Sequence, residues 1–476
     1  MRYYANTGLV DMLPDDVLLS IFDFCVNEDE KRSQRLWQTL VHVCRRWRGL
    51  VFESPCSLNL QLICTSRTPA RDMLDVWPPF PIVIASLPSE ESDDGDYRIQ
   101  NVDNIVAALE HRNRVRQIHI SDISSSGLEK VWAAMQEPFP ELISLALSSG
   151  EKTMAVLPDS FSGGFPRLQE VEFHGIPFPG LPKLLLSATH LTELFLYDIP
   201  HSGYFSPEEI ATALSTLTSL DHLYLGFQSP LSLPDRASRR PRPPKRFVLH
   251  VLTKLGFKGV GEYLEDLMDR IDVPLLRLLG ITFFNQILFD TPRLIQFINR
   301  TSALKAPEKA RVNFWDGTAR VELSSRRASD CFGDLSIEIL CEKSDWQVSS
   351  LEQVCISCLP PLSTVEDLYI SEYLHEESNW QGNIENVLWL ELLQPFTAVK
   401  NLYLSEEFVP RVMLSLQELV GERTTEVLPN LQNIFLEELE KSGPVQEGIW
   451  QFAAIRRVTS HPVTLYLWED PWIGKT

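Results

Sequence analysis

The most regular feature of this chain is a spacing of apolar residues that recurs along most of its length. An apolar residue is followed by two other residues, a second apolar residue, one other residue and a third apolar residue. Chance alone would produce on the order of a dozen such triplets in a chain this apolar, so their spacing along the chain matters more than their number. The triplets are Val115-Ile118-Ile120, Leu142-Leu145-Leu147, Leu168-Val171-Phe173, Leu191-Leu194-Leu196, Leu220-Leu223-Leu225, Leu276-Leu279-Ile281, Val365-Leu368-Ile370, Val399-Leu402-Leu404 and Leu431-Ile434-Leu436.

The spacing of the triplets indicates a repeat protein. The first five begin 27, 26, 23 and 29 residues apart, which is close to the period of leucine-rich repeats. Helical patterns lie between several of them, at Asp103–Glu110, Pro207–Leu217 and Tyr263–Ile271. A short strand followed by a helix, repeated, stacks into a solenoid. Residues 101–476 therefore resemble irregular leucine-rich repeats, without a regular asparagine ladder, and predict an α/β repeat solenoid. An unrelated α/β domain is the alternative.

Residues 282–364 fit this repeat less well. Val312–Trp315 and Arg320–Leu323 are two short apolar segments separated by a turn that contains Asp316-Gly317. Asp-Gly suits a type I′ turn, so these segments predict a β-hairpin. The region can be either a set of degenerate repeats or an insertion.

Aromatic residues recur at one position of the triplets. Triplet side chains should point into the core, and the residues between them should point to the concave surface of the solenoid. Exposed aromatic residues are enriched at interaction hot spots, so this row is the candidate substrate-binding surface. Another part of the chain could instead cover the row, or its rings could pack laterally between strands. The candidates are Phe195, Tyr224, Tyr369, Tyr403 and Phe435, with Tyr197 two positions beyond the first.

The N-terminal residues predict a small helical module over residues 9–52. Leu13-Pro14-Asp15-Asp16 is typical of a helix start, because proline suits a first turn and acidic residues complement the helix dipole. Apolar residues then recur with helical spacing from Val17 to Cys25, and a second segment, Leu36–Val51, carries two apolar faces. A unit of this size has only a small core of its own. We therefore expect its second apolar face to contact a partner. A helical cap on the repeats is the alternative.

Two blocks of this module resemble the F-box motif. They are the leucine-proline start with Ile21-Phe22, and Val43-Cys44-Arg45-Arg46-Trp47. The whole chain also resembles F-box proteins that are numerous in mushroom-forming fungi. The resemblance implies docking onto a Skp-type adaptor of an SCF-type (cullin–RING) ubiquitin ligase. The implied adaptor-binding residues are Leu13, Pro14, Leu18, Ile21, Phe22, Val43, Cys44 and Trp47.

Residues 53–100 are expected to link the module to the repeats. Proline-containing segments such as Trp77–Pro81 disfavour helix there, and Pro88–Asp96 reads as an acidic, solvated loop. Leu58–Leu62 and Ile82–Ile84 look like short strands, which we expect to begin the repeat sheet.

Composition narrows the classes of partner. A formal charge of −21 disfavours nucleic acid and anionic membranes as partners, because their phosphates would be repelled.

The sequence also bears on the location of the protein. No secretory signal is visible at the N-terminus, and the longest apolar stretch, Leu275–Phe284, is too short to span a bilayer. Eight irregularly spaced cysteines suit reduced thiols. A cytoplasmic or nuclear protein is therefore expected.

No motif supports catalysis or a cofactor. Cys355 and Cys358 have a metal-like spacing, but zinc would need a second pair of ligands, so buried thiols are the expectation. The basic run Arg236–Arg246 is interleaved with prolines and reads as a loop, with a nuclear import signal as the alternative. The resemblance to F-box proteins implies a non-enzymatic substrate-recognition subunit of a ubiquitin ligase, and we expect this role. The alternative is a repeat scaffold that does not assemble into a ligase.

Overall fold

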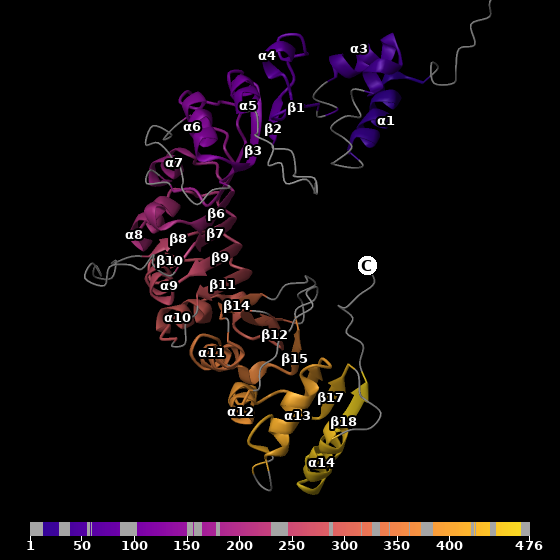
Figure 1. Ribbon diagram of the computed structural model, residues 1–476, viewed down its shortest axis with the longest axis vertical. Helices are drawn as coiled ribbons and strands as arrows, with labels where there is room; N and C mark the ends of the chain where they lie inside the picture. Colours follow the sequence, from indigo (N-terminus) through magenta and orange to yellow (C-terminus); the bar gives the residue numbers. More distant parts are fainter. Residues whose placement is uncertain are drawn as a thin grey trace, which may run out of the picture. The chain divides into compact units, whose positions relative to one another are not determined.

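The computed structural model describes most of the chain, in two compact units, Met1–Leu191 and Thr192–Thr476. The predicted repeat region 101–476 is thus divided between the units. Figure 1 labels the helices and strands of both. The acidic loop 88–96 and residues 28–38 lie outside the described residues. The residues that the structure describes are 13–27, 39–54, 58, 60–85, 102–149, 156, 164–177, 181–229, 246–284, 289–315, 317–325, 334–341, 343–360, 362–372, 384–419, 423, 425–437 and 444–467.

The first unit contains the N-terminal helices and a parallel sheet. Strands β1 to β5 lie side by side in chain order. The predicted strand Ile82–Ile84 lies within β2, whereas of the predicted strand Leu58–Leu62 only Leu62 belongs to β1. The helices are α1 (Asp15–Asn27), α3 (Arg45–Glu53), α4 (Ala70–Met73), α5 (Val102–Leu109), α6 (Ser125–Ala134) and α7 (Leu181–Ser187). The strands are β1 (Leu62–Cys64), β2 (Ile82–Ala85), β3 (Val115–Ile123), β4 (Ser144–Ser149) and β5 (Glu170–His174).

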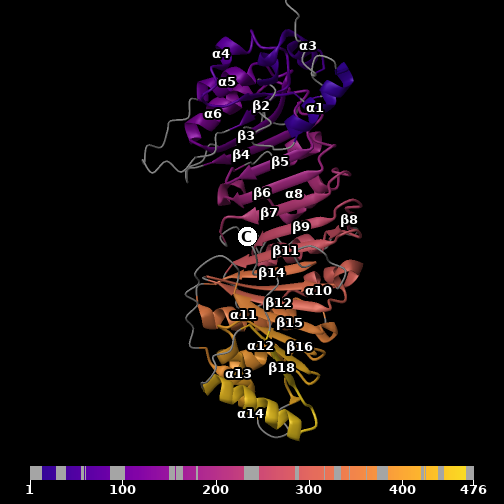
Figure 2. The same ribbon diagram turned by 90° about the vertical axis from the view of Figure 1, so that its right-hand side faces the viewer.

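The second unit contains a longer sheet whose helices lie along one face (Figure 1, Figure 2). Its strand order is β6-β7-β9-β11-β14-β13-β12-β15-β16-β17-β18. The strands are β6 (Glu193–Ile199), β7 (His222–Phe227), β9 (Lys254–Gly259), β11 (Leu278–Phe284), β12 (Lys309–Trp315), β13 (Thr318–Ser324), β14 (Leu335–Leu340), β15 (Asp367–Glu372), β16 (Asn401–Leu404), β17 (Asn433–Leu436) and β18 (Thr464–Leu467). A separate pair joins β8 (Phe247–Val248) to β10 (Ile271–Asp272).

The helices of the second unit follow most of its strands in the chain, as a strand–helix repeat requires. They are α8 (Pro207–Leu214), α9 (Gly261–Met268), α10 (Pro292–Arg300), α11 (Ser344–Ser357), α12 (Asn386–Leu393), α13 (Val409–Gln417) and α14 (Pro444–Val458), with 3-10 turns η2 (His201–Gly203), η4 (Ser302–Leu304) and η5 (Leu362–Thr364). A capping box between Ser206 and Glu209 starts α8. This box satisfies backbone N–H groups that have no partner inside the helix.

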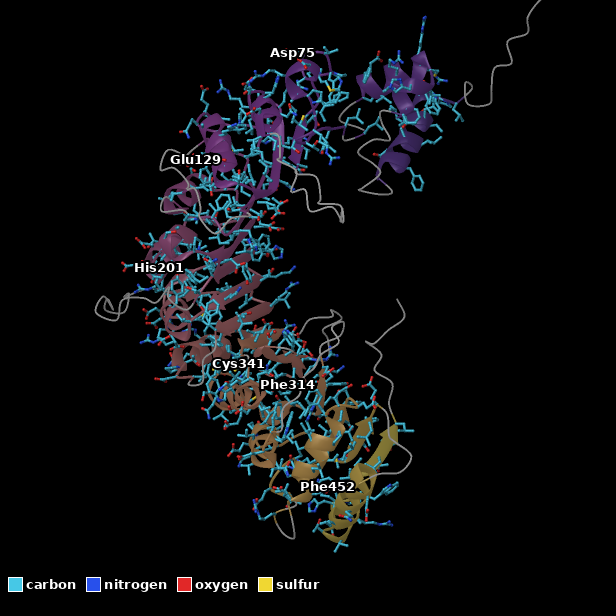
Figure 3. All side chains as sticks on the ribbon, in the orientation of Figure 1. Asp75, Glu129, His201, Phe314, Cys341 and Phe452 are labelled. Carbon is cyan, nitrogen blue, oxygen red and sulfur yellow. The ribbon has the colours of Figure 1, made fainter. Side chains whose placement is uncertain are left out.

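The apolar triplets form the core of both units. Every residue of the nine predicted triplets is 2% exposed or less, which confirms that their side chains point inward. Equivalent residues pair in register, as Leu194, Leu223 and Leu255 do across β6, β7 and β9. A tenth triplet, Leu252-Leu255-Phe257, was not predicted and is equally buried. Phe314 on β12 and Phe452 on α14 add aromatic volume to the interior (Figure 3).

The irregular region 282–364 contains an antiparallel insertion. β12 and β13 form the predicted hairpin, with Trp315 opposite Thr318 and Gly317 at a φ of 67°, a backbone conformation that glycine adopts without strain. β13 is antiparallel to both neighbours, whereas β14 pairs parallel with β11 and β12 pairs parallel with β15. Of the two interpretations left open by the sequence, the strand order favours an insertion.

Because the triplets form the core, truncating one should destabilise the second unit. Leu402→Ala should lower its free energy of unfolding by about 2–5 kcal/mol, the usual cost of a core cavity. Leu414→Ala, at a side chain 44% exposed on α13, should cost about 0.5 kcal/mol or less. Urea unfolding followed by tryptophan fluorescence measures both. Equal effects would contradict the assignment of the triplet to the core.

Candidate interaction surfaces

The interior of the N-terminal module contains two residues that the sequence analysis assigned to adaptor binding. Leu18 and Phe22 are each 1% exposed, and the Phe22 ring lies 4.7 Å from that of Trp47 on α3. This side of α1 packs against α3, so these two side chains cannot contact an adaptor directly. The prediction that Leu18 and Phe22 face the adaptor is therefore corrected.

A neighbouring side of α1 carries an exposed apolar stripe. Val17, Ile21 and Phe24 are 39%, 42% and 65% exposed, and their i, i+4, i+7 spacing places them on one helix face. Val43, at the end of the helical residues 39–43, is 56% exposed. Val17 and Phe24 were missed as candidates, because helical spacing alone does not show which apolar side of α1 is exposed.

The remaining adaptor candidates are at least partly accessible. Pro14 and Cys44 are exposed, whereas Leu13 and Trp47 are half-buried. Cys44 also has a structural role, because its sulfur accepts a hydrogen bond from the Trp47 N–H at the start of α3. The Arg46 guanidinium joins the helices by donating to Asp15 Oδ1 at 2.6 Å and to the Leu13 carbonyl.

The aromatic row of the last repeats forms a continuous ladder on the helix-free face of the second unit. Tyr369, Tyr403, Phe435 and Tyr466 are register partners on β15 to β18. Their ring centroids are 4.2, 4.4 and 5.0 Å apart, and neighbouring planes lie within 17° of each other. The Arg311 guanidinium, 5.7 Å from the Tyr369 ring, extends the ladder at one end.

This ladder supports one of the alternatives raised for the aromatic row, lateral packing between strands. The ring faces of Tyr403 are covered by Tyr369 and Phe435, so the ring edges are the part left for a partner. Tyr466, 45% exposed, ends the ladder with an accessible ring. It was missed because Pro462 occupies the first apolar position of its triplet.

A second ladder of polar groups runs beside the aromatic one. The Asn433 side-chain amide donates to Asn401 Oδ1, and the Asn401 amide donates to Asp367 Oδ1, both at 2.7 Å. These residues lie two positions before the aromatic residues on the same strands, so both ladders share one face. A regular asparagine ladder was not predicted, and this short one covers only the three strands β15 to β17.

The other three aromatic candidates form a separate cluster on β6 and β7. The Phe195 and Tyr197 centroids are 6.1 Å apart, and the Tyr197 and Tyr224 centroids are 4.5 Å apart. The Tyr224 ring also lies over two glycines, because a Cβ added at Gly226 would be 2.7 Å from a ring carbon and one at Gly256 would also clash with the ring. All three rings are half-buried.

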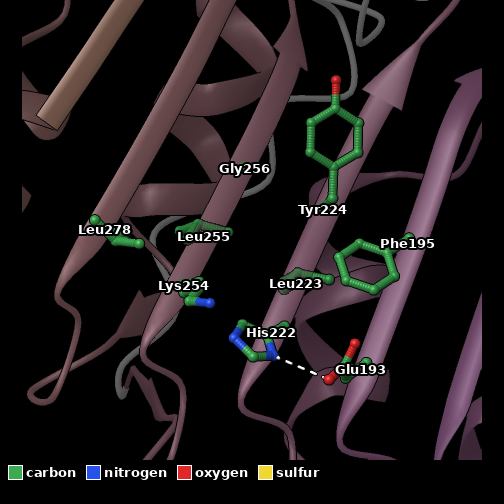
Figure 4. Close-up of a pocket in the computed structure, with 9 residues that line it drawn as sticks. All are labelled: Glu193, Phe195, His222, Leu223, Tyr224, Lys254, Leu255, Gly256 and Leu278. Atoms are coloured by element: carbon green, nitrogen blue, oxygen red, sulfur yellow. Dashed lines mark ion pairs between the residues drawn. The ribbon is translucent and has the colours of Figure 1, made fainter. Parts of the chain in front are cut away.

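An open hollow of about 410 Å³ lies beside this cluster (Figure 4). One register row across its floor holds three polar side chains, Glu193, His222 and Lys254. His222 Nδ1 lies 3.4 Å from Glu193, and its Nε2 lies 3.6 Å from Asp221. The lining residues are Glu193, Phe195, His222, Leu223, Tyr224, Lys254, Leu255, Gly256 and Leu278.

Charged residues of the insertion separate the two aromatic groups. Arg320 on β13 donates to Glu338 at 2.5 Å and lies 3.2 Å from Glu322, and its guanidinium is 4.9 Å from the Trp315 ring. These groups are largely buried and paired with each other. The insertion therefore contributes a satisfied ionic cluster to the helix-free face.

The cysteine pair considered for metal binding lies in the interior. Cys355 and Cys358 are buried, and the Cys358 sulfur lies 3.1 Å from the Thr291 hydroxyl. Burial raises the pKa of Cys358 to about 12, which disfavours the thiolate that a metal ligand requires. Within the described ranges, no group of three or more His, Cys, Asp or Glu residues is placed to hold a metal ion.

Two further features bear on partners. Of the basic run Arg236–Arg246, only Arg246 is described, and its guanidinium lies 3.7 Å from Asp269. No helix in the described part of the chain combines the length and apolar character needed to cross a bilayer.

Comparisons with known proteins found matches among solved structures. No protein-family model and no curated protein matches the sequence. The solved structures similar to this chain include the leucine-rich repeat-containing protein LegL7 from Legionella pneumophila, with a TM-score of 0.28 and 13% identity. That match covers 83% of this chain and 98% of the other. The repeat character described above follows from the strand register and the buried triplets.

Stacking and burial make the aromatic ladder sensitive to alkaline pH. Burial, aided by neighbouring Tyr403 and Asp367, raises the pKa of Tyr369 above its ordinary value. The stabilisation linked to this raised pKa should be complete below about pH 10, the unfolded value, and should be lost at higher pH. Tyr369→Phe should therefore flatten the fall of the unfolding free energy above pH 10. Urea titrations at pH 8, 10 and 11 measure this, and parallel curves for parent and variant would contradict it.

Proposed function

We propose that this chain is the substrate-recognition subunit of an SCF-type (cullin–RING) ubiquitin ligase. In this proposal the N-terminal module binds a Skp-type adaptor, and the helix-free face of the repeats binds a target protein. Other subunits transfer ubiquitin, and this chain contributes proximity by holding an acceptor lysine near them. We assign no catalytic residue to it.

One observation carries the adaptor half of the proposal. The helix that contains the first F-box-like block exposes Val17, Ile21 and Phe24 in one apolar stripe. A stripe of this kind is the pattern by which a helix docks into a hydrophobic groove. The second F-box-like block adds exposed Val43 and Cys44. The residues that face outward thus include members of both blocks that resemble the motif.

The target half of the proposal rests on the character of the repeat face. This face carries two groups of aromatic side chains and a ladder of side-chain amides, and it contains an open hollow. Tyrosine and phenylalanine edges give contact area at low entropic cost, and amides give adaptable hydrogen bonds. Such a mixture suits protein recognition better than a small-molecule site, since the hollow is open to solvent.

A second candidate is a repeat scaffold that does not join a ligase. One contact favours it: Phe52 at the end of α3 lies 6.0 Å from Phe80, just before β2. The module therefore packs near the first strands of the sheet, as a helical cap would. A cap does not explain why the exposed stripe on α1 is apolar, so adaptor binding remains the preferred proposal.

Adaptor binding should depend on the exposed stripe. Ile21→Ala and Phe24→Ala should each weaken binding to a purified Skp-type adaptor, because hot-spot truncations cost about 2 kcal/mol or more, roughly 30-fold in affinity. Asp16→Asn, in the same helix at an exposed polar position outside the stripe, is the matched control and should bind like the parent. Isothermal titration calorimetry gives the affinities. Failure of the parent chain to bind any such adaptor would favour the scaffold.

Target capture should depend on the aromatic ladder. Tyr369→Ala and Tyr403→Ala should remove proteins that co-purify with the chain and leave adaptor binding unchanged. Tyr403→Phe keeps the stacked ring and should retain most of them. Quantitative mass spectrometry of the captured proteins compares the variants. Loss of folding in the alanine variants, seen by circular dichroism, would show that the ladder serves only lateral packing.

A further inference from the structure

Three strand glycines lie on the helix-free face of the second unit, and internal packing explains only two of them. Gly226 and Gly256 make room for the Tyr224 ring, which a Cβ at either position would strike. Gly280 on β11 is the register partner of Gly256 and so shares its face. A Cβ added at Gly280 would meet nothing within 4 Å. Glycine inside a strand weakens the strand and often marks a close approach by a ligand or another chain.

The surroundings of Gly280 form a seat for one bulky side chain. Its neighbour on the β9 side is Gly256, over which the Tyr224 ring lies, and its neighbour on β14 is the small Ser336. Leu278, two residues earlier on the same strand, lines the hollow and is half-buried. The floor is thus backbone, and one wall is an aromatic ring. Aromatic pairs gain about 0.5–1.5 kcal/mol beyond burial of their area, so an aromatic side chain suits the seat best.

The charges around the hollow specify what should accompany that ring. Glu193 lies beside His222, and Asp221 accepts a hydrogen bond from the Thr253 hydroxyl at 2.7 Å. Lys254 is exposed, and none of the described carboxylates lies within ion-pair distance of it. Its ammonium is therefore available to a carboxylate from a partner, which must lie directly at Lys254 because Glu193 and Asp221 make the rest of the hollow acidic.

The spacing of these features matches an extended peptide. Lys254 is the register partner of Leu278, so it lies one strand and two residues from Gly280. Side chains at positions i and i+2 of an extended chain lie on one side, about 7 Å apart. A ring on Gly280 and a carboxylate at Lys254 can thus come from residues two positions apart.

We propose that the Gly256–Gly280 strip is a subsite for a protein segment that carries an aromatic residue two positions from an aspartate or glutamate. The aromatic ring would lie on Gly280 against Tyr224, and the carboxylate would pair with Lys254. This inference deepens the proposed function by naming the chemistry of the target segment. It does not require adaptor binding, so the two can fail separately.

Blocked, labelled peptides test the subsite on the full chain. The probe is a nonapeptide of serine and glycine with a central tryptophan and an aspartate two residues before it. Matched peptides replace the aspartate with lysine, or the tryptophan with alanine. Fluorescence anisotropy up to millimolar concentration should show binding of the probe at least about tenfold tighter than of either matched peptide. Equal binding of all three, or no binding of the probe, would overturn the proposal.

Two substitutions connect the binding to the named residues. Gly280→Trp fills the seat from within and should abolish probe binding, while the free space at its Cβ should leave the thermal unfolding temperature near that of the parent. Ala146→Trp, at the equivalent position of β4 between Leu145 and Leu147, is the matched control and should leave binding unchanged. Equal loss in both variants, or none in Gly280→Trp, would contradict the subsite.

A charge reversal keeps the test decisive if Gly280→Trp fails to fold. Lys254→Glu alters an exposed side chain and should invert the preference, so that the lysine peptide binds more tightly than the aspartate peptide. An unchanged preference would overturn the assignment of Lys254. Binding of a Skp-type adaptor, measured on the same preparations, should not differ among these variants.

Discussion

In-register parallel pairing of successive strands is the constraint on which the rest of this structure depends. Because side chains alternate along a strand, register fixes which residues enter the core and which line the open face. A slip of one residue would bury Tyr403 and expose Leu402 and Leu404. The buried triplets therefore do more than stabilise the core. They hold each open-face residue beside its equivalent on the next strand, and this alignment creates the ladders and the hollow.

The antiparallel insertion preserves this alignment while it changes the chemistry of the face. The register row of Gly280 continues through Ser336, Glu322 and Arg311 to Tyr369. Charged residues thus occupy the middle of a row that is aromatic towards both ends. Glu322 pairs with Arg320, and the Arg311 guanidinium lies 5.7 Å from the Tyr369 ring. The insertion therefore places charged groups between the two aromatic groups of the open face.

Local patterns in the sequence predicted the elements well, because burial of a triplet and the start of a helix depend on neighbouring residues. The hairpin was also predicted locally, from the sequence Asp316-Gly317, and Gly317 has the positive φ that such a turn needs. The position of β14 between β11 and β13 could not be predicted, because strand order depends on contacts between distant segments. The hollow likewise requires the pairing of Gly256 with Gly280, which no local pattern shows.

The two sides of α1 illustrate a second limit. Leu18 and Phe22 are as apolar as Ile21 and Phe24, so the sequence could not tell which side packs on α3 and which side is exposed. Tyr466 illustrates a third limit of prediction from sequence. Pro462 disrupts its triplet, but pairing of β18 with β17 still places the Tyr466 ring on the ladder. In each case a tertiary contact, and not a local preference, decides the role of the side chain.

Hydrogen–deuterium exchange of the full chain, with and without a purified Skp-type adaptor, tests the central assignment most directly. Adaptor binding should slow exchange in α1 and α3 and leave the strands of the second unit unchanged. The open face would then remain available to a target while the adaptor is bound. Protection that appears on those strands, or its absence from α1 and α3, would contradict the assignment of separate surfaces to adaptor and target.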